Sequence, residues 1–255
     1  LFARLETWEE AAAQPPPKST SLAPDMVLPK LHHLVGEEGE TRQGQRDFAL
    51  AVAQIFAPKA KPKQPHLLLA EAGTGIGKTY GYLAPAAAWV EQSGGTVWLS
   101  TYTKALQRQL SQAAAKLYPD LDQRRKRLVI RKGRENYLCL LNLEDALQGG
   151  FSGRSAVLAQ LVARWALYSQ DGDMRGGDLP GWLLPLFHKS GANALTDRRG
   201  ECIFAACQHY NKCFIERASH LSAKADLVIA NHALVMLLAN RGRDEAQGLR
   251  RIIFD

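Results

Sequence analysis

The sequence predicts an α/β protein whose parallel sheet is interrupted by a mainly helical insertion. Short apolar runs alternate with helical patterns between residues 41 and 131, and again after residue 221. Such alternation is typical of a parallel sheet covered by helices. Between residues 132 and 221 the alternation stops, and this segment contains glycine-rich turns and every cysteine of the chain. We therefore expect one α/β domain in two parts, 41–131 and 222–255, around an insertion at 132–221.

The composition is that of a globular protein outside the membrane. Hydrophobic residues make up 46% of the 255 residues and charged residues 22%, which are ordinary proportions. No apolar run approaches the roughly 20 residues that a membrane-spanning helix needs, and the first residues lack the pattern of a signal peptide. The 32 Lys and Arg against 25 Asp and Glu give a net charge of +7, which is compatible with a nucleic-acid partner. We expect a cytoplasmic protein with no membrane partner.

Residues 1–40 precede the α/β pattern. They are rich in proline and have few periodic apolar positions, so we expect an extension or linker. From residue 41 to residue 56, apolar side chains fall on one helical face, and Arg42 and Gln45 stand at the start of this helix. The amide of Gln45 suits the edge of an adenine ring, and Arg42 can reach a phosphate or stack on a ring.

A glycine-rich loop follows the apolar run Leu67–Ala70, which we expect to be a strand buried on both faces. Alternating glycines let successive backbone N–H groups turn inward around an anion, and the helix that follows adds its own unpaired N–H groups. Lys78 is placed to reach the β- and γ-phosphates and Thr79 to bind Mg²⁺. Ala72 stands where the strict pattern has glycine. The predicted nucleotide contacts in this loop are Gly73, Thr74, Gly75, Gly77, Lys78 and Thr79.

Four further apolar runs predict the other strands of the sheet. They lie at 96–100, 128–130, 226–232 and 251–255, and the first is followed by a long helical pattern from 104 to 117. Ligand sites of parallel sheets lie at the carboxyl ends of the strands, which is where the last run carries Asp255.

The four cysteines predict a metal site within the insertion. Cys139 is followed after 62 residues by Cys202, and Cys207 and Cys213 follow after gaps of 4 and 5 residues. Four soft ligands suit a tetrahedral thiolate site that holds a long loop closed. Zinc is one candidate, although structural zinc sites usually draw on two close pairs of ligands. One distant and three clustered cysteines fit a cubane iron–sulfur cluster somewhat better.

Together these motifs resemble the iron–sulfur-cluster DNA helicases of superfamily 2, the DinG/XPD family, and are most similar to its bacterial DinG-like members. The resemblance runs from about residue 41 to the end of the chain. The residues that carry it are Arg42 and Gln45, EAGTGIGKT at 71–79, STYTKALQRQL at 100–110, KGRENYLC at 132–139, the three later cysteines, ADLVIANHALVM at 225–236 and RIIFD at 251–255.

The resemblance implies a RecA-like motor domain with an inserted 4Fe–4S domain. It implies an ATP-dependent DNA helicase that moves 5′→3′ on single-stranded DNA in DNA repair or replication-fork maintenance, with ATP, Mg²⁺ and a 4Fe–4S cluster as cofactors. Asp255 matches the first, Mg²⁺-supporting residue of the Asp-Glu-Ala-His motif, and the four cysteines match the cluster ligands. The Glu of that motif and the second motor domain are not within the sequence, so we expect an N-terminal motor fragment that is inactive alone.

The resemblance also points to DNA contacts. A hydroxyl or ammonium group can hold a phosphate, and a tyrosine can stack on a base. We expect a monomer that binds single-stranded or forked DNA and works with replication or repair proteins. The expected contact residues are Thr101, Thr103, Lys104, Arg134 and Tyr137.

Two other functions fit parts of the pattern. One is a P-loop NTPase with a zinc-stapled insertion and no role on nucleic acid. The other is a redox-responsive nucleic-acid-binding module that is not an enzyme. Stimulation of ATP hydrolysis by single-stranded DNA distinguishes the helicase from the first, and turnover that ignores cluster oxidation counts against the second.

Overall fold

The computed structural model describes residues 2–10, 14–36, 39, 42–59, 64–186, 191–197, 201–240 and 249–255. The chain divides into two compact units. We call Ala13–Ile130 with Ser222–Asp255 the sheet unit, and Leu1–Ala12 with Arg131–Leu221 the cysteine unit.

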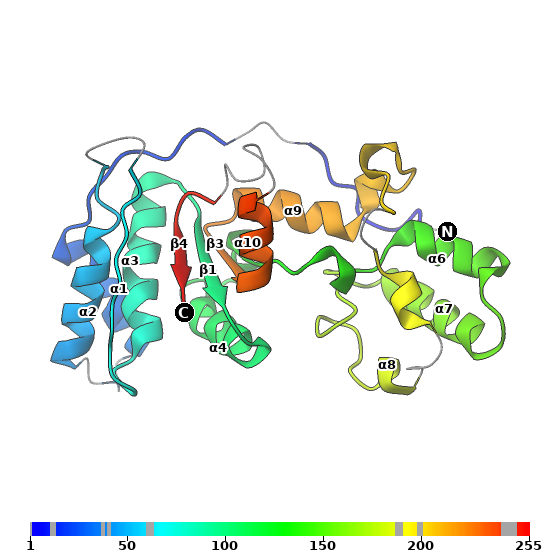
Figure 1. Ribbon diagram of the computed structural model, residues 1–255, viewed down its shortest axis with the longest axis horizontal. Coiled ribbons are helices and arrows are strands. Elements are labelled where there is room, and N and C mark those ends of the chain that lie inside the picture. Colours follow the sequence, from blue (N-terminus) through cyan, green and yellow to red (C-terminus); the bar gives the residue numbers. More distant parts are fainter. Residues whose placement is uncertain are drawn as a thin grey trace. The chain divides into compact units, whose positions relative to one another are not determined.

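A four-stranded parallel sheet lies at the centre of the sheet unit, with strand order β2-β3-β1-β4 (Figure 1). The predicted α/β class with a parallel sheet is therefore confirmed. The elements of this unit are α1 (Pro24–Val35), α2 (Gln43–Gln54), α3 (Lys78–Ser93), β1 (Val97–Thr101), α4 (Lys104–Ala115), α5 (Leu121–Arg127), β2 (Leu128–Ile130), β3 (Leu227–Asn231), α10 (His232–Asn240) and β4 (Ile252–Phe254).

The core of the sheet unit follows from the two-residue period of its strands. Val97 and Leu99 of β1 and Leu227 and Ile229 of β3 are buried in one cluster with side chains of α1 to α4. Successive strand residues point to opposite faces of a sheet, so these alternate positions face the same helices. All five residues of β1 are buried, because this strand is paired on both edges, with β3 and with β4.

The extension or linker expected for residues 1–40 is wrong for residues 24–35. They form α1, whose Val27, Leu31 and Leu34 are fully buried in the core of the sheet unit. Pro24 is compatible with this helix because it lies in the first turn, where a backbone N–H has no acceptor within the helix. Near the start of the chain, Phe2 and Leu5 are also buried, in the core of the cysteine unit.

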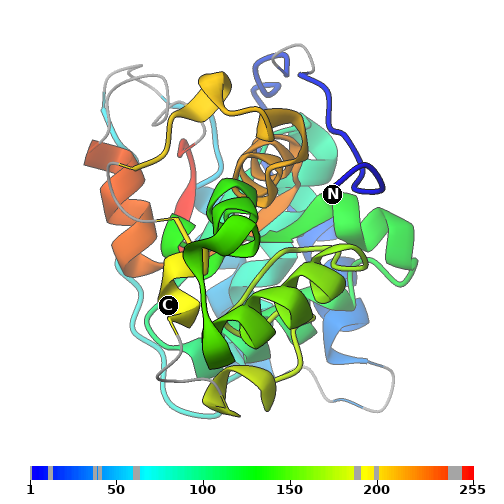
Figure 2. The ribbon, with the colours of Figure 1, turned by 90° about the vertical axis from the view of Figure 1, so that its right-hand side faces the viewer.

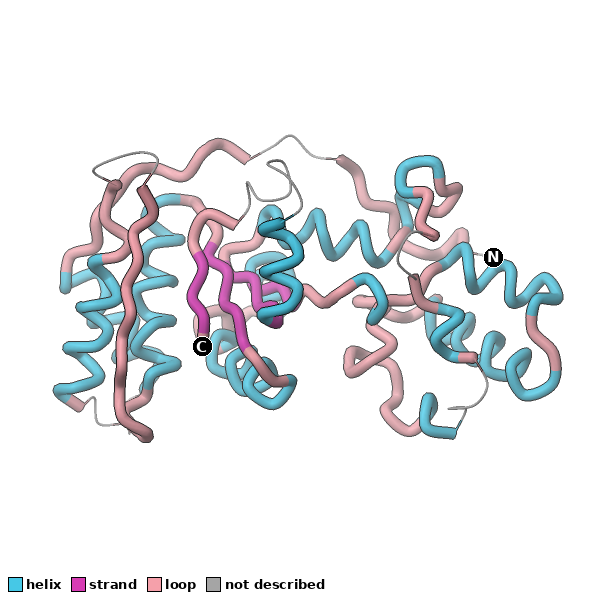
Figure 3. Tube along the Cα trace, viewed as in Figure 1, coloured by secondary structure: helices cyan, strands magenta, loops and turns pink. Residues whose placement is uncertain are grey.

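The buried strand expected at Leu67–Ala70 is also wrong. This segment is an irregular, extended part of the chain (Figure 3), and Leu67 and Leu69 are 79% and 87% exposed. An apolar run gives a segment a preference for burial, but a strand forms only when a neighbouring strand supplies hydrogen-bond partners. In the described sheet the outermost strand next to β1 is β4, and residues 67–70 are not paired with it.

The cysteine unit is built from short helices around a core of its own (Figure 2). Leu138, Leu140 and Leu143 pack in this core with Leu158 and Val162. The described residues contain no helix that is long and apolar enough to cross a membrane. The elements of this unit are η1 (Arg134–Asn136), α6 (Leu140–Asp145), η2 (Ala146–Gly150), α7 (Gly153–Ala166), α8 (Leu183–Leu186), η3 (Ala192–Leu195), η4 (Phe204–Ala206), η5 (Tyr210–Lys212) and α9 (Phe214–Lys224), whose last residues pass the boundary of the unit.

Candidate nucleotide site and cysteine cavity

The glycine-rich loop forms a turn that leads directly into α3. Gly75 and Gly77 have φ angles of +79° and +83°, in the left-handed region that strains residues with a Cβ atom. Lys78 is the first residue of α3 and Gly77 its N-cap, so the unpaired N–H groups of the helix begin at the loop. Lys78 Nζ donates a hydrogen bond to the Ala72 carbonyl at 2.9 Å. The backbone arrangement is that of an anion cradle.

The start of α2 braces this loop. Arg42 Nη1 donates to the carbonyl of Gly75 at 3.1 Å, and Gln45 Nε2 donates to the carbonyl of Gly77 at 3.0 Å. Gln45 is 5% exposed, so its amide is held against the loop by packing as well as by this bond. The structure thus brings both residues to the glycine-rich turn, whereas an adenine contact by Gln45 stays a prediction.

We expect Gly77→Ala to destabilise the protein and weaken nucleotide binding. A Cβ atom at this position would lie 2.0 Å from Gln45 Nε2, and the φ angle of +83° is strained for alanine. The left-handed conformation alone costs roughly 1–2 kcal/mol. Gly73→Ala is the matched control, because a Cβ atom there meets no atom within 4 Å. Thermal unfolding of the two variants checks this prediction, and equal midpoints would contradict it.

Asp255 lies at the carboxyl end of β4, as predicted. Its backbone N–H donates to the carbonyl of Ser100 at 2.9 Å, and its carboxylate accepts a 2.8 Å hydrogen bond from the hydroxyl of Tyr82. Thr79 lies in the first turn of the same helix, three positions before Tyr82. Sequence reasoning missed Tyr82; the available signal is its position three residues after Thr79, on the same face of α3.

The three residues expected to contact DNA at the end of β1 differ in how exposed their side chains are. Thr101 is 1% exposed, and its hydroxyl has no hydrogen-bond partner within the described residues. Because it is buried, its hydroxyl is not presented to a phosphate in this conformation, and the DNA contact expected of Thr101 stays a prediction. Thr103 caps α4 by accepting from Leu106 N at 3.1 Å. Lys104 is exposed at the first position of α4.

Two neighbouring residues were missed by sequence reasoning. Tyr102 is 79% exposed between Thr101 and Thr103. Its ring lies 6.1 Å from the ring of His232, which in turn hydrogen bonds through Nδ1 to the Ser100 hydroxyl at 2.7 Å. An exposed aromatic ring beside a lysine suits single-stranded nucleic acid better than the buried Thr101 does.

In the cysteine unit, Tyr137 and Arg134 are held by protein partners. Tyr137 is 4% exposed, and its hydroxyl accepts the backbone N–H of Lys132 at 3.1 Å. A buried ring is not available to stack on a base in this conformation, so the DNA contact expected of Tyr137 stays a prediction. The guanidinium of Arg134 donates to Asp197 at 2.6 Å and to Glu216 at 2.9 Å. With its donors directed at these carboxylates, Arg134 is not presented to a DNA phosphate.

All four cysteine side chains line one cavity in the cysteine unit. Arg134 Nη2 donates to Cys202 Sγ at 2.9 Å, and the backbone N–H of Phe204 lies 3.4 Å from the same sulfur. Burial raises the pKa of the Cys139 thiol, and it raises the pKa of the Cys213 thiol to about 11. The cavity therefore collects cysteines that are up to 74 positions apart in the sequence, from Cys139 to Cys213.

Comparison with known proteins gives the family. No protein-family model matches the chain. The chain is 33% identical over 202 residues to the ATP-dependent DNA helicase YoaA of Escherichia coli, a match that covers 76% of this chain and 29% of that protein. It is 33% identical over 219 residues to the ATP-dependent helicase DinG of Mycobacterium tuberculosis, covering 78% of this chain and 31% of that protein. The matched part of the chain belongs to the DinG-like helicases.

A third relative carries a different name. The protein called 3′-5′ exonuclease DinG in Bacillus subtilis is 34% identical over 202 residues, which are 77% of this chain and 20% of that protein. The DinG-like chain thus spans less than a third of the length of these curated relatives.

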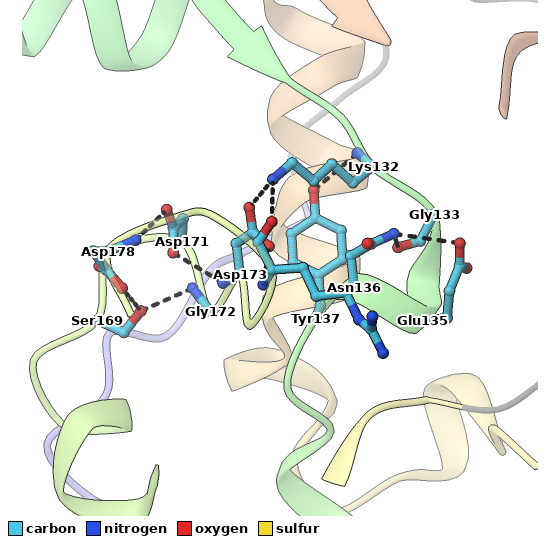
Figure 4. A network of polar contacts seen from close by, with 11 residues as sticks. Lys132, Gly133, Glu135, Asn136, Tyr137, Ser169, Asp171, Gly172, Asp173 and Asp178 are labelled. Carbon is cyan, nitrogen blue, oxygen red and sulfur yellow. Dashed lines mark hydrogen bonds and ion pairs between the residues drawn. The ribbon is translucent and has the colours of Figure 1, made fainter. Parts of the chain in front are cut away.

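A polar network in the DinG-like chain ties the segment before Cys139 to the loop at 169–178 (Figure 4). Lys132 forms an ion pair with Asp173 and donates its backbone N–H to Tyr137. In the loop, Asp178 accepts from the Ser169 hydroxyl at 2.7 Å. The described side chains hold this segment in place before the chain reaches the cavity.

We expect Asp171→Asn to stabilise the protein at about pH 7.5 more than at about pH 4. Burial and the nearby charges of Asp178 and Asp173 raise the pKa of Asp171 from 3.8 to about 6. The stability that protonated Asp171 contributes is therefore fully present below about pH 4 and is lost as the pH rises through about 6. Urea unfolding at both pH values checks this. Asp145→Asn, at an exposed aspartate of the same unit, is the control, and equal effects of the two substitutions would contradict the prediction.

Proposed function

We propose that this chain is the RecA-like first motor domain of an ATP-dependent DNA helicase. The helicase moves 5′→3′ on single-stranded DNA and acts in DNA repair or replication-fork maintenance. The observation that carries the proposal is the loop at the start of α3, in which two left-handed glycines precede Lys78 and are braced by Arg42 and Gln45. The similarity to the ATP-dependent DNA helicase YoaA and to the ATP-dependent helicase DinG supports ATP as a ligand, and the similarity to YoaA also supports DNA.

Each residue of the loop has a part in holding the nucleotide. The N–H groups of the turn and of the first turn of α3 surround the phosphates. Lys78 exchanges its bond to the Ala72 carbonyl for the β- and γ-phosphates. Thr79 and Asp255 would hold Mg²⁺, which neutralises charge on the phosphates when it is bound. Arg42 lies beside the loop, within reach of a nucleotide.

The insertion at 132–221, which makes up most of the cysteine unit, carries in this proposal a 4Fe–4S cluster held by Cys139, Cys202, Cys207 and Cys213. The fit rests on the four sulfur side chains that surround one cavity. In a cubane each iron has its own thiolate, so the ligands need not converge on one point. Within the described residues, no group of three or more His, Cys, Asp or Glu side chains lies close enough to hold one metal ion.

Single-stranded or forked DNA is the proposed substrate. Lys104 and Tyr102, both exposed after β1, provide a cation for a phosphate and a ring for a base. The net charge of +7 favours such a polyanion. The protein works as a cytoplasmic monomer alongside replication or repair proteins.

ATP hydrolysis with and without single-stranded DNA tests this function in a protein that contains the chain and its second motor domain. The expected result is strong stimulation, with unwinding of duplexes that carry a 5′ tail and not of those with a 3′ tail. A visible absorption band and about four irons per chain are expected after anaerobic purification. A rate of ATP hydrolysis that single-stranded DNA does not change, together with bound zinc, would instead favour the zinc-stapled NTPase.

A further inference from the structure

Tyr82 connects the two segments of the chain that carry the proposed Mg²⁺ ligands, Thr79 and Asp255. It lies in α3, one turn after Lys78 and Thr79, and is 4% exposed. Its hydroxyl donates to Asp255 Oδ2 at 2.8 Å. Asp255 comes from the far end of the chain, 173 positions later. Tyr82 thus contacts one of the two side chains that the proposed function assigns to Mg²⁺ and follows the other, Thr79, by three positions on one face of α3.

We propose that Tyr82 is a positioning residue that holds the Asp255 carboxylate beside Thr79 for Mg²⁺. This inference rests on the proposed function, because it concerns the same nucleotide site. Tyr82 does not bind the metal itself; it fixes the direction of the acid that does.

The contacts explain how Tyr82 does this. The backbone of Asp255 is fixed by its bond to the Ser100 carbonyl, but the side chain is exposed and would otherwise rotate. The bond from Tyr82 occupies Oδ2 and leaves Oδ1 for the metal or its water.

Tyr82→Phe tests the inference because it keeps the buried ring and removes only the hydroxyl. The measurement is the affinity for ATP, first in EDTA and then across a titration of Mg²⁺. The Mg²⁺ concentration for half-maximal enhancement should rise about tenfold or more, the usual effect of removing a partner that orients a metal ligand. Affinity in EDTA should change less than about twofold, since the phosphate loop is intact.

Tyr118→Phe is the matched control. Tyr118 is also a buried tyrosine of the sheet unit, and its hydroxyl donates to Asp226 Oδ2 at 3.0 Å. Both substitutions remove one Tyr–Asp bond, so both should lower the thermal midpoint. Only Tyr82→Phe should change the Mg²⁺ requirement. An equal Mg²⁺ requirement in the two variants would overturn the inference.

Asp255→Asn supplies a second arm that does not depend on the folding of Tyr82→Phe. It should raise the Mg²⁺ requirement by itself, and adding Tyr82→Phe should then change it less than about twofold, because coupled residues are not additive. Full additivity would overturn the inference. If Lys78→Ala weakens ATP binding while Tyr82→Phe leaves the Mg²⁺ requirement unchanged, only the inference fails. If Lys78→Ala has no effect on ATP binding, the proposed function fails, and the inference that rests on it fails as well.

Discussion

Replacing Cys207 with serine is expected to remove iron from the purified protein and to disorder residues 201–213, while the sheet unit stays folded. The cysteine-bearing segment consists of single turns, η4 and η5, and Ile203 and Phe204 are 52% and 54% exposed. Polar contacts tie it to the rest of its unit, such as His209 Nε2 with Glu144 at 2.9 Å and Lys212 Nζ with the Phe2 carbonyl at 2.9 Å. Because it contains no longer element, we expect the proposed cluster to be needed for its order. The buried sheet and its core lie in a separate unit.

Iron analysis and hydrogen exchange measure the two effects of this substitution. Ala206→Ser is the control, because it introduces the same hydroxyl one residue earlier, at an exposed position. It should keep its iron and its exchange protection. Stoichiometric iron in Cys207→Ser would show that Cys207 is not a cluster ligand.

Lys78→Ala is expected to abolish ATP hydrolysis by the helicase, with a loss on the order of 10²-fold or more, as for other preorganised contacts to developing charge. The fold should be nearly unaffected, within about 0.5 kcal/mol. The described hydrogen bond of Lys78 is to a loop carbonyl, and its side chain takes no part in the core clusters.

The control for this substitution is Lys59→Ala, which removes an exposed lysine of the same unit. It should hydrolyse ATP at the original rate. Steady-state turnover and thermal unfolding of both variants distinguish a local loss of a phosphate contact from a general loss of structure. Unchanged turnover in Lys78→Ala would remove the basis of the phosphate-cradle assignment.

The centre of the sheet could be predicted from sequence because its two inner strands, β1 and β3, are almost entirely buried. The runs around β1 and β3 are continuous and apolar, and helical patterns follow them, so class and strand direction follow from local signals. The helix α1 also had such a signal, since Val27, Leu31 and Leu34 recur at helical spacing. The prolines of residues 1–40 predict a linker, yet Pro24 and Pro29 both lie within this helix.

Contacts between segments that are far apart in the sequence could not be predicted in the same way. Leu67–Ala70 has the composition of a strand, yet strand formation depends on a neighbour that local sequence does not specify. Tyr137 has the residue type of a base-stacking group, but tertiary packing buries it. The bonds of Arg134 to Asp197 and Glu216 cross 63 and 82 positions of sequence. The glycine-rich loop was predictable because its geometry is set within a few consecutive residues.

Titration of the 255-residue protein with Mg²⁺–ATP tests the central claim most directly. The loop that holds the phosphates is present, whereas catalysis by such motors also needs a water-positioning residue and an arginine from across the cleft, which alone is worth on the order of 10³-fold. We predict saturable binding that Lys78→Ala weakens and Lys59→Ala does not, with no hydrolysis stimulated by single-stranded DNA. Absence of binding, equal binding by Lys78→Ala, or vigorous hydrolysis by this chain alone would contradict the account.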